Sequence, residues 1–253
     1  MTGLVLRGVT REFSEPADRH VLRGVDLAIA PGEFVSLVGP SGSGKTTLLR
    51  LIAGLDTPDA GSVTWQAERR PRFGAVFQEP RLVPWLSILD NLLLVTGPDR
   101  RERARALLAE VELAGNEDAL PGQLSGGMQR RAALARALLV EPEFLMLDEP
   151  LISLDSALAE RMRSLLNDYW RERRTTTLLV THNLSEAAEL STRILILSPT
   201  EGRITADCAL PLPDPRQRND RAVTTVLEDL RRMTQAWPRP EPHDTQGTLS
   251  RAS

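Results

Sequence analysis

The sequence contains very little cysteine and no long apolar run. Cys208 is the only cysteine among 253 residues, so an internal disulfide is excluded and a reducing compartment is favoured. No apolar stretch approaches the roughly 18 residues that cross a bilayer, so we expect no transmembrane helix. Residues 1–4 (Met-Thr-Gly-Leu) lack the basic and then apolar character of a secretory signal peptide.

The sequence also lacks an excess of positive charge. It has 31 Lys and Arg residues against 34 Asp and Glu residues, for a net charge of −3, so it has no overall basic character of the kind that binds nucleic acid. Hydrophobic residues make up 41% and charged residues 26%, as in an ordinary globular protein. The length allows one large or two modest domains, and we find no internal repeat.

The most informative segment is the P-loop, residues 39–46 (Gly-Pro-Ser-Gly-Ser-Gly-Lys-Thr), which fits the phosphate-binding pattern G-x-x-x-x-G-K-[ST]. Residues 34–38 before it are predicted to form a buried strand, and the helical spacing after it ends at Gly54. Glycines allow successive backbone N–H groups to point at an anion, and the helix N-terminus adds positive partial charge. We expect Lys45 to reach the β- and γ-phosphates and the Thr46 hydroxyl to hold Mg²⁺.

A second segment pairs two carboxylates with an apolar run. Residues 144–147 (Phe-Leu-Met-Leu) precede Asp148 and Glu149, which predicts a central strand with its acids at the carboxyl end, where ligands bind in open α/β sheets. We expect Asp148 to hold Mg²⁺, mostly through water, and Glu149 to polarise the attacking water. Taken alone, an acidic pair after a core strand is also common at protein surfaces.

A third segment, the signature segment at residues 124–128 (Leu-Ser-Gly-Gly-Met), opens a helix that we expect to run through Leu138. Ser125 supplies a capping hydroxyl, and the glycines leave free N–H groups at the helix start, so this is a second potential anion site. An ordinary helix cap has the same residues. A chain with one P-loop and a second phosphate site suggests that two copies share each nucleotide.

Together these motifs resemble the ATP-binding subunit of ATP-binding-cassette (ABC) transporters. The family order continues with Gln78 after residues 76–77, with Asp155 after residues 153–154, and with His182 after residues 180–181. The resemblance covers residues from about 3 to 212. It implies an α/β fold, in which a P-loop NTPase core of the ABC ATPase type carries an antiparallel β subdomain and an inserted helical subdomain at about residues 87–140.

The resemblance also implies a composite site for ATP and Mg²⁺. Glu149 acts as general base, His182 contacts the γ-phosphate, and Gln78 touches Mg²⁺ and the attacking water. Asp155 lies at the dimer interface. The phosphates of one nucleotide are wrapped by Gly39, Pro40, Ser41, Gly42, Ser43, Gly44, Lys45, Thr46 and Thr47. The metal is held by Thr46, Gln78 and Asp148, and the site of the opposite subunit is completed by Ser125, Gly126 and Gly127.

Two surface contacts are also implied by the resemblance. The family stacks an aromatic residue on adenine, for which Phe13 is the best candidate and His20 the second, although Phe13 fits a core role almost as well. A helix of the membrane permease docks near residues 81–86 (Arg-Leu-Val-Pro-Trp-Leu), which we call the docking segment. An apolar segment with an exposed Trp85 suits such a partner, and burial of Trp85 inside the helical subdomain is the alternative.

The finer resemblance is to importers of nitrate, taurine and aliphatic sulfonates, through residues 77–85, 52–58 and 169–172. It implies a sulfonate or related small anion as solute, a solute-binding protein as indirect partner, and a peripheral position at the cytoplasmic face of the inner membrane. Three positions depart from the commonest family pattern without removing a phosphate, metal or base group. They are Met128 in the signature segment, Ile152-Ser153 before Leu154, and Asn183 after His182.

The composition changes near the end of the chain. We expect the ATP-binding domain at residues 1–212, then a linker and one amphipathic helix at 213–236, and a disordered tail at 237–253 rich in Pro, Ser, Thr and charge. The sequence is also compatible with two rival functions. One is a non-transport cassette ATPase acting on nucleic acid or ribosomes, which usually has coiled-coil arms or tandem cassettes. The other is a nucleotide-binding module without turnover, against which Glu149 and His182 argue.

Overall fold

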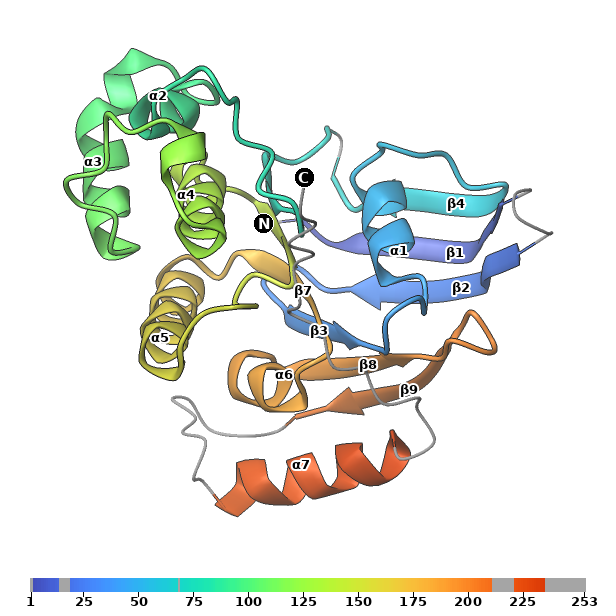
Figure 1. Ribbon diagram of the computed structural model, residues 1–253. Coiled ribbons are helices and arrows are strands. Elements are labelled where there is room, and N and C mark those ends of the chain that lie inside the picture. Colours follow the sequence, from blue (N-terminus) through green and yellow to red (C-terminus); the bar gives the residue numbers. More distant parts are fainter. Residues whose placement is uncertain (1, 14–18, 68, 211–220, 235–253) are drawn as a thin grey trace, which may run out of the picture.

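The structure is a computed structural model that describes residues 2–13, 19–67, 69–210 and 221–234. In this part of the chain the strands form two sheets, and helices cover both faces of the larger one (Figure 1). The smaller sheet is antiparallel, with strand order β2-β1-β4. Its strands are β1 (Leu4–Phe13), β2 (Arg19–Ile29) and β4 (Ala60–Trp65).

The larger sheet has strand order β5-β6-β7-β3-β8-β9. All of its neighbouring pairs are parallel except β8 and β9, which are antiparallel. This mixed architecture confirms the predicted α/β class. The strands are β3 (Phe34–Val38), β5 (Phe73–Val76), β6 (Phe144–Asp148), β7 (Thr176–Thr181), β8 (Arg193–Leu197) and β9 (Ile204–Ala209).

The helices fall into three groups. Helix α1 (Lys45–Ile52) packs in the core between the two sheets. Helices α2 (Ile88–Leu93), α3 (Arg101–Glu110) and α4 (Gly126–Leu139) form a lobe at the left of Figure 1, which we call the helical lobe. The remaining helices are α5 (Ser156–Arg173), α6 (Leu184–Leu190) and α7 (Arg221–Met233), with short 3-10 turns at Pro98–Arg100 and Pro121–Gln123.

The central strands are buried on both faces, which explains their nearly continuous apolar sequences. In β3 all five residues are buried. Because side chains alternate along a strand, Phe34 packs against Trp170 of α5 in a cluster that continues into the helical lobe, whereas Val35 and Leu37 pack toward the antiparallel sheet. Helices α6 and α7 cover a third cluster together with Val38. The end of β3 is thus fixed from both sides, immediately before the P-loop.

The structure differs from the sequence-based prediction in several elements. Partial alternation of apolar residues within 5–30 predicts short strands and a hairpin. The segment instead forms the longer strands β1 and β2, of ten and eleven residues, because β-bulges interrupt the alternation without ending the pairing. The sequence also predicts a short strand at residues 73–78, and this strand ends at Val76. Neither the seven-residue α6 nor the edge strand β9 was predicted, since α6 is short and β9 alternates between half-buried and exposed residues.

The helical stretches agree better with the prediction. Three α-helices lie within residues 87–140. The i, i+3 and i+4 spacing of Ala104, Leu107 and Leu108 predicts one apolar helix face, and all three are buried in α3. The amphipathic helix expected after residue 220 is α7, whose Val223, Leu227 and Leu230 are buried. Residues 213–220 and 235–236 of the predicted linker and helix region at 213–236, and the whole predicted tail at 237–253, lie outside the described residues. No helix in the described part of the chain is long and apolar enough to cross a membrane.

Candidate active site

Three neighbouring parallel strands bring the predicted site residues to one edge of the large sheet. Strand β7 pairs with β6 on one side and with β3 on the other. The P-loop follows β3, Glu149 follows β6, and His182 follows β7. Because the carboxyl ends of parallel strands meet at the same edge, these three chain segments converge although they are far apart in the sequence.

The conformation of the P-loop requires glycine at two positions. Gly44, which caps α1, has a φ of 97°, and a Cβ placed there would lie 2.8 Å from Cγ1 of Val21. A Cβ on Gly39 would lie 2.6 Å from Oγ of Ser43 and 2.9 Å from the carbonyl oxygen of Leu197. Side chains at these positions would therefore distort the turn that presents the start of α1.

Lys45 lies inside the P-loop. Its side chain is buried, and its ammonium donates to the carbonyl oxygens of Gly39 and Pro40 at 2.6 and 2.8 Å. Burial lowers the pKa of Lys45, and the carboxylates of Glu149 and Asp148 oppose this shift. An ammonium has three N–H donors. Two of them are used by these carbonyl oxygens, and the third has no acceptor among the described residues, so it is available to an anion. The buried Oγ of Ser43 likewise has no partner among the described residues, as expected for a loop that accepts a phosphate group.

Thr46 and Asp148 form an oxygen pair beside the P-loop. The Thr46 hydroxyl donates to Oδ2 of Asp148 at 3.3 Å. Asp148 is buried, and burial raises its pKa to about 6, with Glu149 acting in the same direction and Thr46 and Lys45 in the opposite one. Hydroxyl and carboxylate oxygens suit a hard divalent cation, and the charge of such an ion would favour the ionised carboxylate.

Glu149 and His182 are in direct contact. The ring Nδ1 of His182 lies 2.8 Å from each carboxylate oxygen of Glu149, and this hydrogen bond raises the pKa of His182, with burial opposing it. Glu149 has a positive φ of 51°, which is uncommon for a residue other than glycine, and its N–H donates to the carbonyl oxygen of Val180 at 2.9 Å. The backbone thus holds the carboxylate at the end of β6, next to the residue that follows β7.

The signature segment is a surface feature at the start of α4. Oγ of Ser125 accepts from the N–H of Met128 at 3.3 Å, so Ser125 caps the helix. Ser125 and Gly126 are exposed. In the described part of the chain no hydrogen bond or ion pair joins residues 125–127 to the P-loop. Asp155 is also exposed and caps α5 through the N–H of Leu158 at 2.9 Å.

The three departures from the family pattern have local structural roles. Met128 packs against the core of the helical lobe. The carbonyl oxygen of Ile152 accepts from Arg130 at 3.3 Å. Asn183 caps α6, because its side-chain oxygen accepts from the N–H groups of Ser185 and Glu186. None of them disturbs the contacts of Lys45, Asp148, Glu149 or His182.

The docking segment lies at the surface, with Arg81, Pro84 and Trp85 exposed, and it is held by several hydrogen bonds. Trp85 is 77% exposed, so the alternative that it is buried inside the helical subdomain is wrong. The buried side chain of Asn91 donates to the carbonyl oxygens of Val83, Leu86 and Ser87 and accepts from the N–H of Val83 at 2.7 Å.

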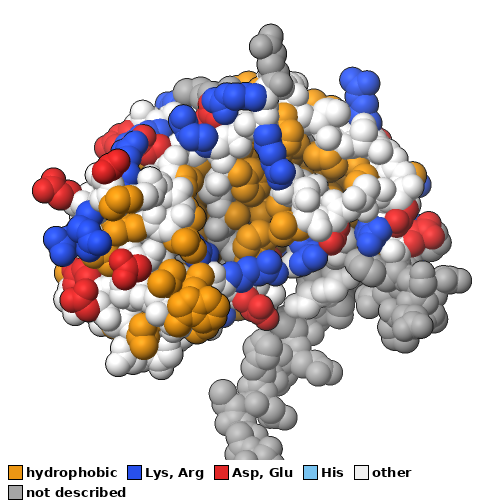
Figure 2. Space-filling view, turned by 90° about the horizontal axis from the view of Figure 1, so that it is seen from above, with side chains coloured by type: hydrophobic (Ala, Val, Ile, Leu, Met, Phe, Trp, Pro, Cys, Tyr) orange, Lys and Arg blue, Asp and Glu red, His pale blue; other side chains and the backbone are white. Residues whose placement is uncertain are grey.

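Arg136 of α4 holds the start of the same loop, since it donates to the carbonyl oxygens of Pro80 and Arg81 at 2.9 Å each. Sequence reasoning missed both supports, Asn91 and Arg136, because nothing in the sequence relates them to a loop. Figure 2, which views the molecule from above, shows hydrophobic side chains gathered near the centre of the view and at its lower left. Leu94, Val95 and Leu120 of the lobe region are also exposed.

The structure gives less information on the predicted magnesium contact of Gln78 and on the predicted adenine contact. Gln78 is exposed and follows the end of β5 by two residues. Phe13 and His20 belong to the ends of β1 and β2, where the backbones pair, but their side chains lie outside the described part. The adenine contact therefore stays a prediction.

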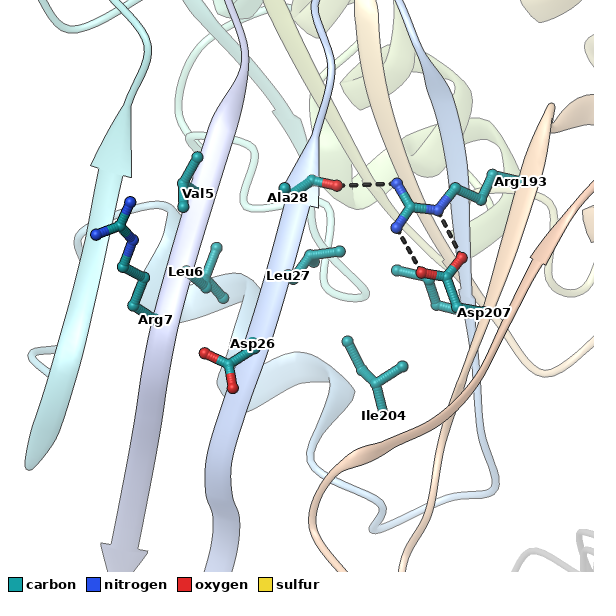
Figure 3. A pocket seen from close by; sticks show the side chains of 10 residues that line it. Val5, Leu6, Arg7, Asp26, Leu27, Ala28, Arg193, Ile204 and Asp207 are labelled. Atoms are coloured by element: carbon teal, nitrogen blue, oxygen red, sulfur yellow. Dashed lines mark hydrogen bonds and ion pairs between the residues drawn. The ribbon is translucent and has the colours of Figure 1, made fainter.

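A pocket of about 350 Å³ lies away from these residues, between β1, β2, β8 and β9 (Figure 3). Arg193 in its wall donates to both carboxylate oxygens of Asp207 at 2.6 Å and to the carbonyl oxygen of Ala28 at 2.9 Å. Arg193 pairs in register with Val35, at the opposite end of β3 from the P-loop. The guanidinium links the two sheets, and the pocket contains none of the predicted site residues.

Comparisons with known proteins agree with this geometry. The ABC transporter family profile matches residues 22–152. The chain is a member of the ABC transporter family. An aliphatic sulfonates import ATP-binding protein, SsuB 2 of Streptomyces avermitilis, is 50% identical over 89% of this chain and 88% of that protein. SsuB 1 of Burkholderia cenocepacia, with the same description, is 43% identical over 96% of this chain and 76% of that protein.

Solved structures of ABC cassettes share the fold. The bacterial ABC transporter cassette MJ0796, described as dimeric, is 33% identical with a TM-score of 0.75, covering 83% of this chain and all of that chain. The same cassette in a dimeric post-hydrolysis state bound to ADP and Pi matches equally well. The predicted ABC ATPase fold is thus confirmed, and as a member of this family the chain binds and hydrolyses ATP.

Proposed function

We propose that two copies of this chain hydrolyse ATP at shared sites to power the uptake of a small organic anion, an aliphatic sulfonate, through a separate membrane permease. The convergence of Lys45, Asp148, Glu149 and His182 at one sheet edge carries this proposal. The chain is the ATP-hydrolysing subunit of an ABC importer, because its curated relatives are import proteins of this kind. These relatives do not favour the rival function on nucleic acid or ribosomes.

Each residue at the sheet edge has a distinct chemical task. Lys45 neutralises charge on the β- and γ-phosphates, and the backbone N–H groups of the P-loop surround them. Glu149 orients the attacking water and accepts its proton, while His182 contacts the γ-phosphate. In phosphoryl transfer most of the catalytic effect is positioning and charge stabilisation, so the hydrogen bond between Glu149 and His182 serves to keep both groups at the γ-phosphate position.

The residues fit a magnesium ion that arrives with the nucleotide. Mg²⁺ is usually held by one or two carboxylates together with substrate phosphates and waters. In the described part of the chain no cluster of three His, Cys, Asp or Glu residues forms a metal cage, whereas Asp148 and Thr46 provide adjacent oxygens. With Gln78, they would hold the ion, which when bound supplies charge neutralisation to the phosphates.

The second copy completes the site. Ser125, Gly126 and Gly127 are exposed or half-exposed, and together they present a helix start to solvent. In a sandwich dimer these groups would reach the nucleotide in the P-loop of the partner, with Asp155 near the interface. The permease would hold the pair at the cytoplasmic face of the inner membrane, and a solute-binding protein would deliver the anion on the other side.

Growth on different sulfur sources tests the identity of the transported anion. A strain lacking this gene is expected to lose growth on an alkanesulfonate as sole sulfur source and to keep growth on sulfate. The wild-type gene should restore growth, and a Lys45→Ala gene should not. Normal growth of the deletion strain on alkanesulfonates, with loss of growth on taurine or nitrate instead, would assign the subunit to another anion.

Amine modification is expected to inactivate the ATPase through a single residue. Lys45 is the only lysine of the chain, and its lowered pKa increases the share of the reactive neutral amine. An amine-reactive reagent should abolish hydrolysis in step with labelling of Lys45, measured by peptide mass spectrometry, and ATP should protect. A Lys45→Arg variant controls for labelling of the α-amino group. Inactivation without label on Lys45, or labelling unaffected by ATP, would count against nucleotide binding in the P-loop.

Trp85→Ala is expected to weaken binding to the permease. Losing a large apolar anchor costs about 2 kcal/mol or more at such surfaces, which is about thirtyfold in affinity. The unfolding temperature and basal ATPase activity of the isolated subunit should change little, because Trp85 is exposed. Transport and substrate-stimulated hydrolysis in the complex should fall together.

The matched control is Leu94→Ala, an exposed apolar residue of the helical lobe outside the docking segment. It should leave permease binding intact. Quantitative co-purification of the permease from detergent-solubilised membranes measures both variants. Equal losses in the two variants, or normal binding by Trp85→Ala, would remove the docking segment from the interface.

A further inference from the structure

The turn that carries His182 is held by a small buried network. We call residues 181–186, from the end of β7 into α6, the switch turn. Thr181 is fully buried, and its hydroxyl donates to Oε2 of Glu186 at 2.5 Å while accepting from the N–H of Asn183 at 3.0 Å. The side-chain oxygen of Asn183 accepts from the N–H groups of Ser185 and Glu186 at 3.0 and 3.3 Å. His182 is thus bracketed on both sides by anchored residues.

Glu186 is an unusual residue at this place. It is only 5% exposed, and its second oxygen, Oε1, is buried without a partner among the described residues. Burial raises its pKa to about 7, with Glu149 acting in the same direction and with Thr181, Arg163 and His182 opposing. A buried carboxyl group with an unpaired oxygen costs stability compared with an apolar side chain of similar size. Packing of α6 alone therefore does not explain a glutamate here.

A neighbouring glutamate on the same helix shows the contrast. Glu189 is similarly buried, at 6% exposure, but its carboxylate lies 2.9 Å from the guanidinium of Arg163. That ion pair joins α6 to α5 and does not involve the switch turn. Glu189 therefore has a structural explanation, whereas the hydrogen bond of Glu186 reaches only Thr181, the residue directly before His182.

We propose that Glu186 is a positioning residue for ATP hydrolysis, because through the Thr181 hydroxyl it fixes the turn that holds His182 against Glu149. The inference rests on the proposed role of His182. The side chain of His182 is about half exposed, with 49% of its surface accessible, and its ring contacts the carboxylate of Glu149 at 2.8 Å. An exposed ring keeps a defined orientation only when its backbone is held, and the network of Thr181, Asn183 and Glu186 does this.

The test compares steady-state ATP hydrolysis by full-length variants. Glu186→Ala is expected to lower kcat on the order of tenfold with little change in KM for ATP, because misplacing a catalytic group affects the chemical step more than binding. Glu186→Gln should keep kcat within about twofold, since its amide oxygen can still accept from Thr181. Thr181→Val should behave like Glu186→Ala, and Thr181→Ser like the wild type. The double variant Thr181→Val/Glu186→Ala should lose no more than either single change.

Glu189→Ala is the matched control. It removes an equally buried carboxylate from α6 and should lower the unfolding temperature without a tenfold loss of kcat. Equal losses of kcat in Glu186→Ala and Glu189→Ala, or additive losses in the double variant, would show that Glu186 only stabilises α6 and would overturn the proposal. His182→Ala distinguishes the role of His182 from that of Glu186. If His182→Ala retains full activity, the role of His182 is wrong; if it is inactive while Glu186→Ala is unaffected, only the role of Glu186 is wrong.

Discussion

Lys45→Ala is expected to reduce ATP hydrolysis on the order of 100-fold or more, because one preorganised donor to the transition state typically contributes that much. Lys45 is the buried cation at the centre of the P-loop, next to the carboxylates of Asp148 and Glu149. Nucleotide affinity should fall as well, since the ammonium also contacts the phosphates in the ground state. Phosphate release and equilibrium binding of a fluorescent ATP analogue measure the two effects separately.

The fold should survive this change. The substitution removes two hydrogen bonds, to the carbonyl oxygens of Gly39 and Pro40, and it also removes a buried charge, so the two effects on stability oppose each other. Circular dichroism and thermal unfolding should show a folded protein with a transition close to that of the wild type. Full ATPase activity in a pure, folded Lys45→Ala protein would contradict the P-loop assignment.

Glu149→Gln is expected to keep ATP binding and to slow cleavage on the order of 100-fold or more, in the range of a general base. The amide retains the shape of the carboxylate, but it can no longer accept a proton from water. Uncleaved ATP should then hold two subunits together, and the dimer should accumulate. Multi-angle light scattering with Mg²⁺ and ATP measures this, with Mg²⁺ and ADP as the control. A Glu149→Gln protein that binds ATP and hydrolyses it at the wild-type rate would exclude Glu149 as the base.

Much of the candidate site could be predicted because its residues follow strands with strong sequence patterns. The strands ending at Val38, Asp148 and Thr181 contain apolar runs and are buried on both faces, so their position in a parallel sheet and the convergence of their carboxyl ends follow from the sequence. The hydrogen bond between Glu149 and His182 could not be predicted from the sequence, because this bond depends on the positive φ of Glu149.

The rest of the site depends on tertiary contacts that leave little trace in the sequence. Glu186 lies in a helix of seven residues whose packing decides its burial. Asn91 and Arg136 support the docking segment through backbone carbonyl groups, which are present at every position and therefore carry no sequence pattern. Trp85 could equally have been buried, since an apolar residue near a helix start fits either environment, and only the structure shows its exposure.

The most direct test of the shared site is activity in a mixture of two inactive variants. Gly126→Asp is suited to this test, because a Cβ at Gly126 meets no atom within 4 Å, and an acidic residue in the first turn of α4 is favourable within its own chain. Its negative charge would instead repel the phosphates of the partner's nucleotide. Glu149→Gln supplies an intact signature segment but no base.

We expect each variant alone to be nearly inactive and the mixture to regain ATP hydrolysis. In a mixed dimer, the P-loop and Glu149 of the Gly126→Asp chain meet the intact signature segment of the Glu149→Gln chain, which completes one site. Phosphate release at increasing ratios of the two purified proteins measures this regain. A mixture that is no more active than the sum of its parts, although the two chains associate with Mg²⁺ and ATP, would contradict a site shared between two copies. Full activity of Gly126→Asp on its own would contradict it as well.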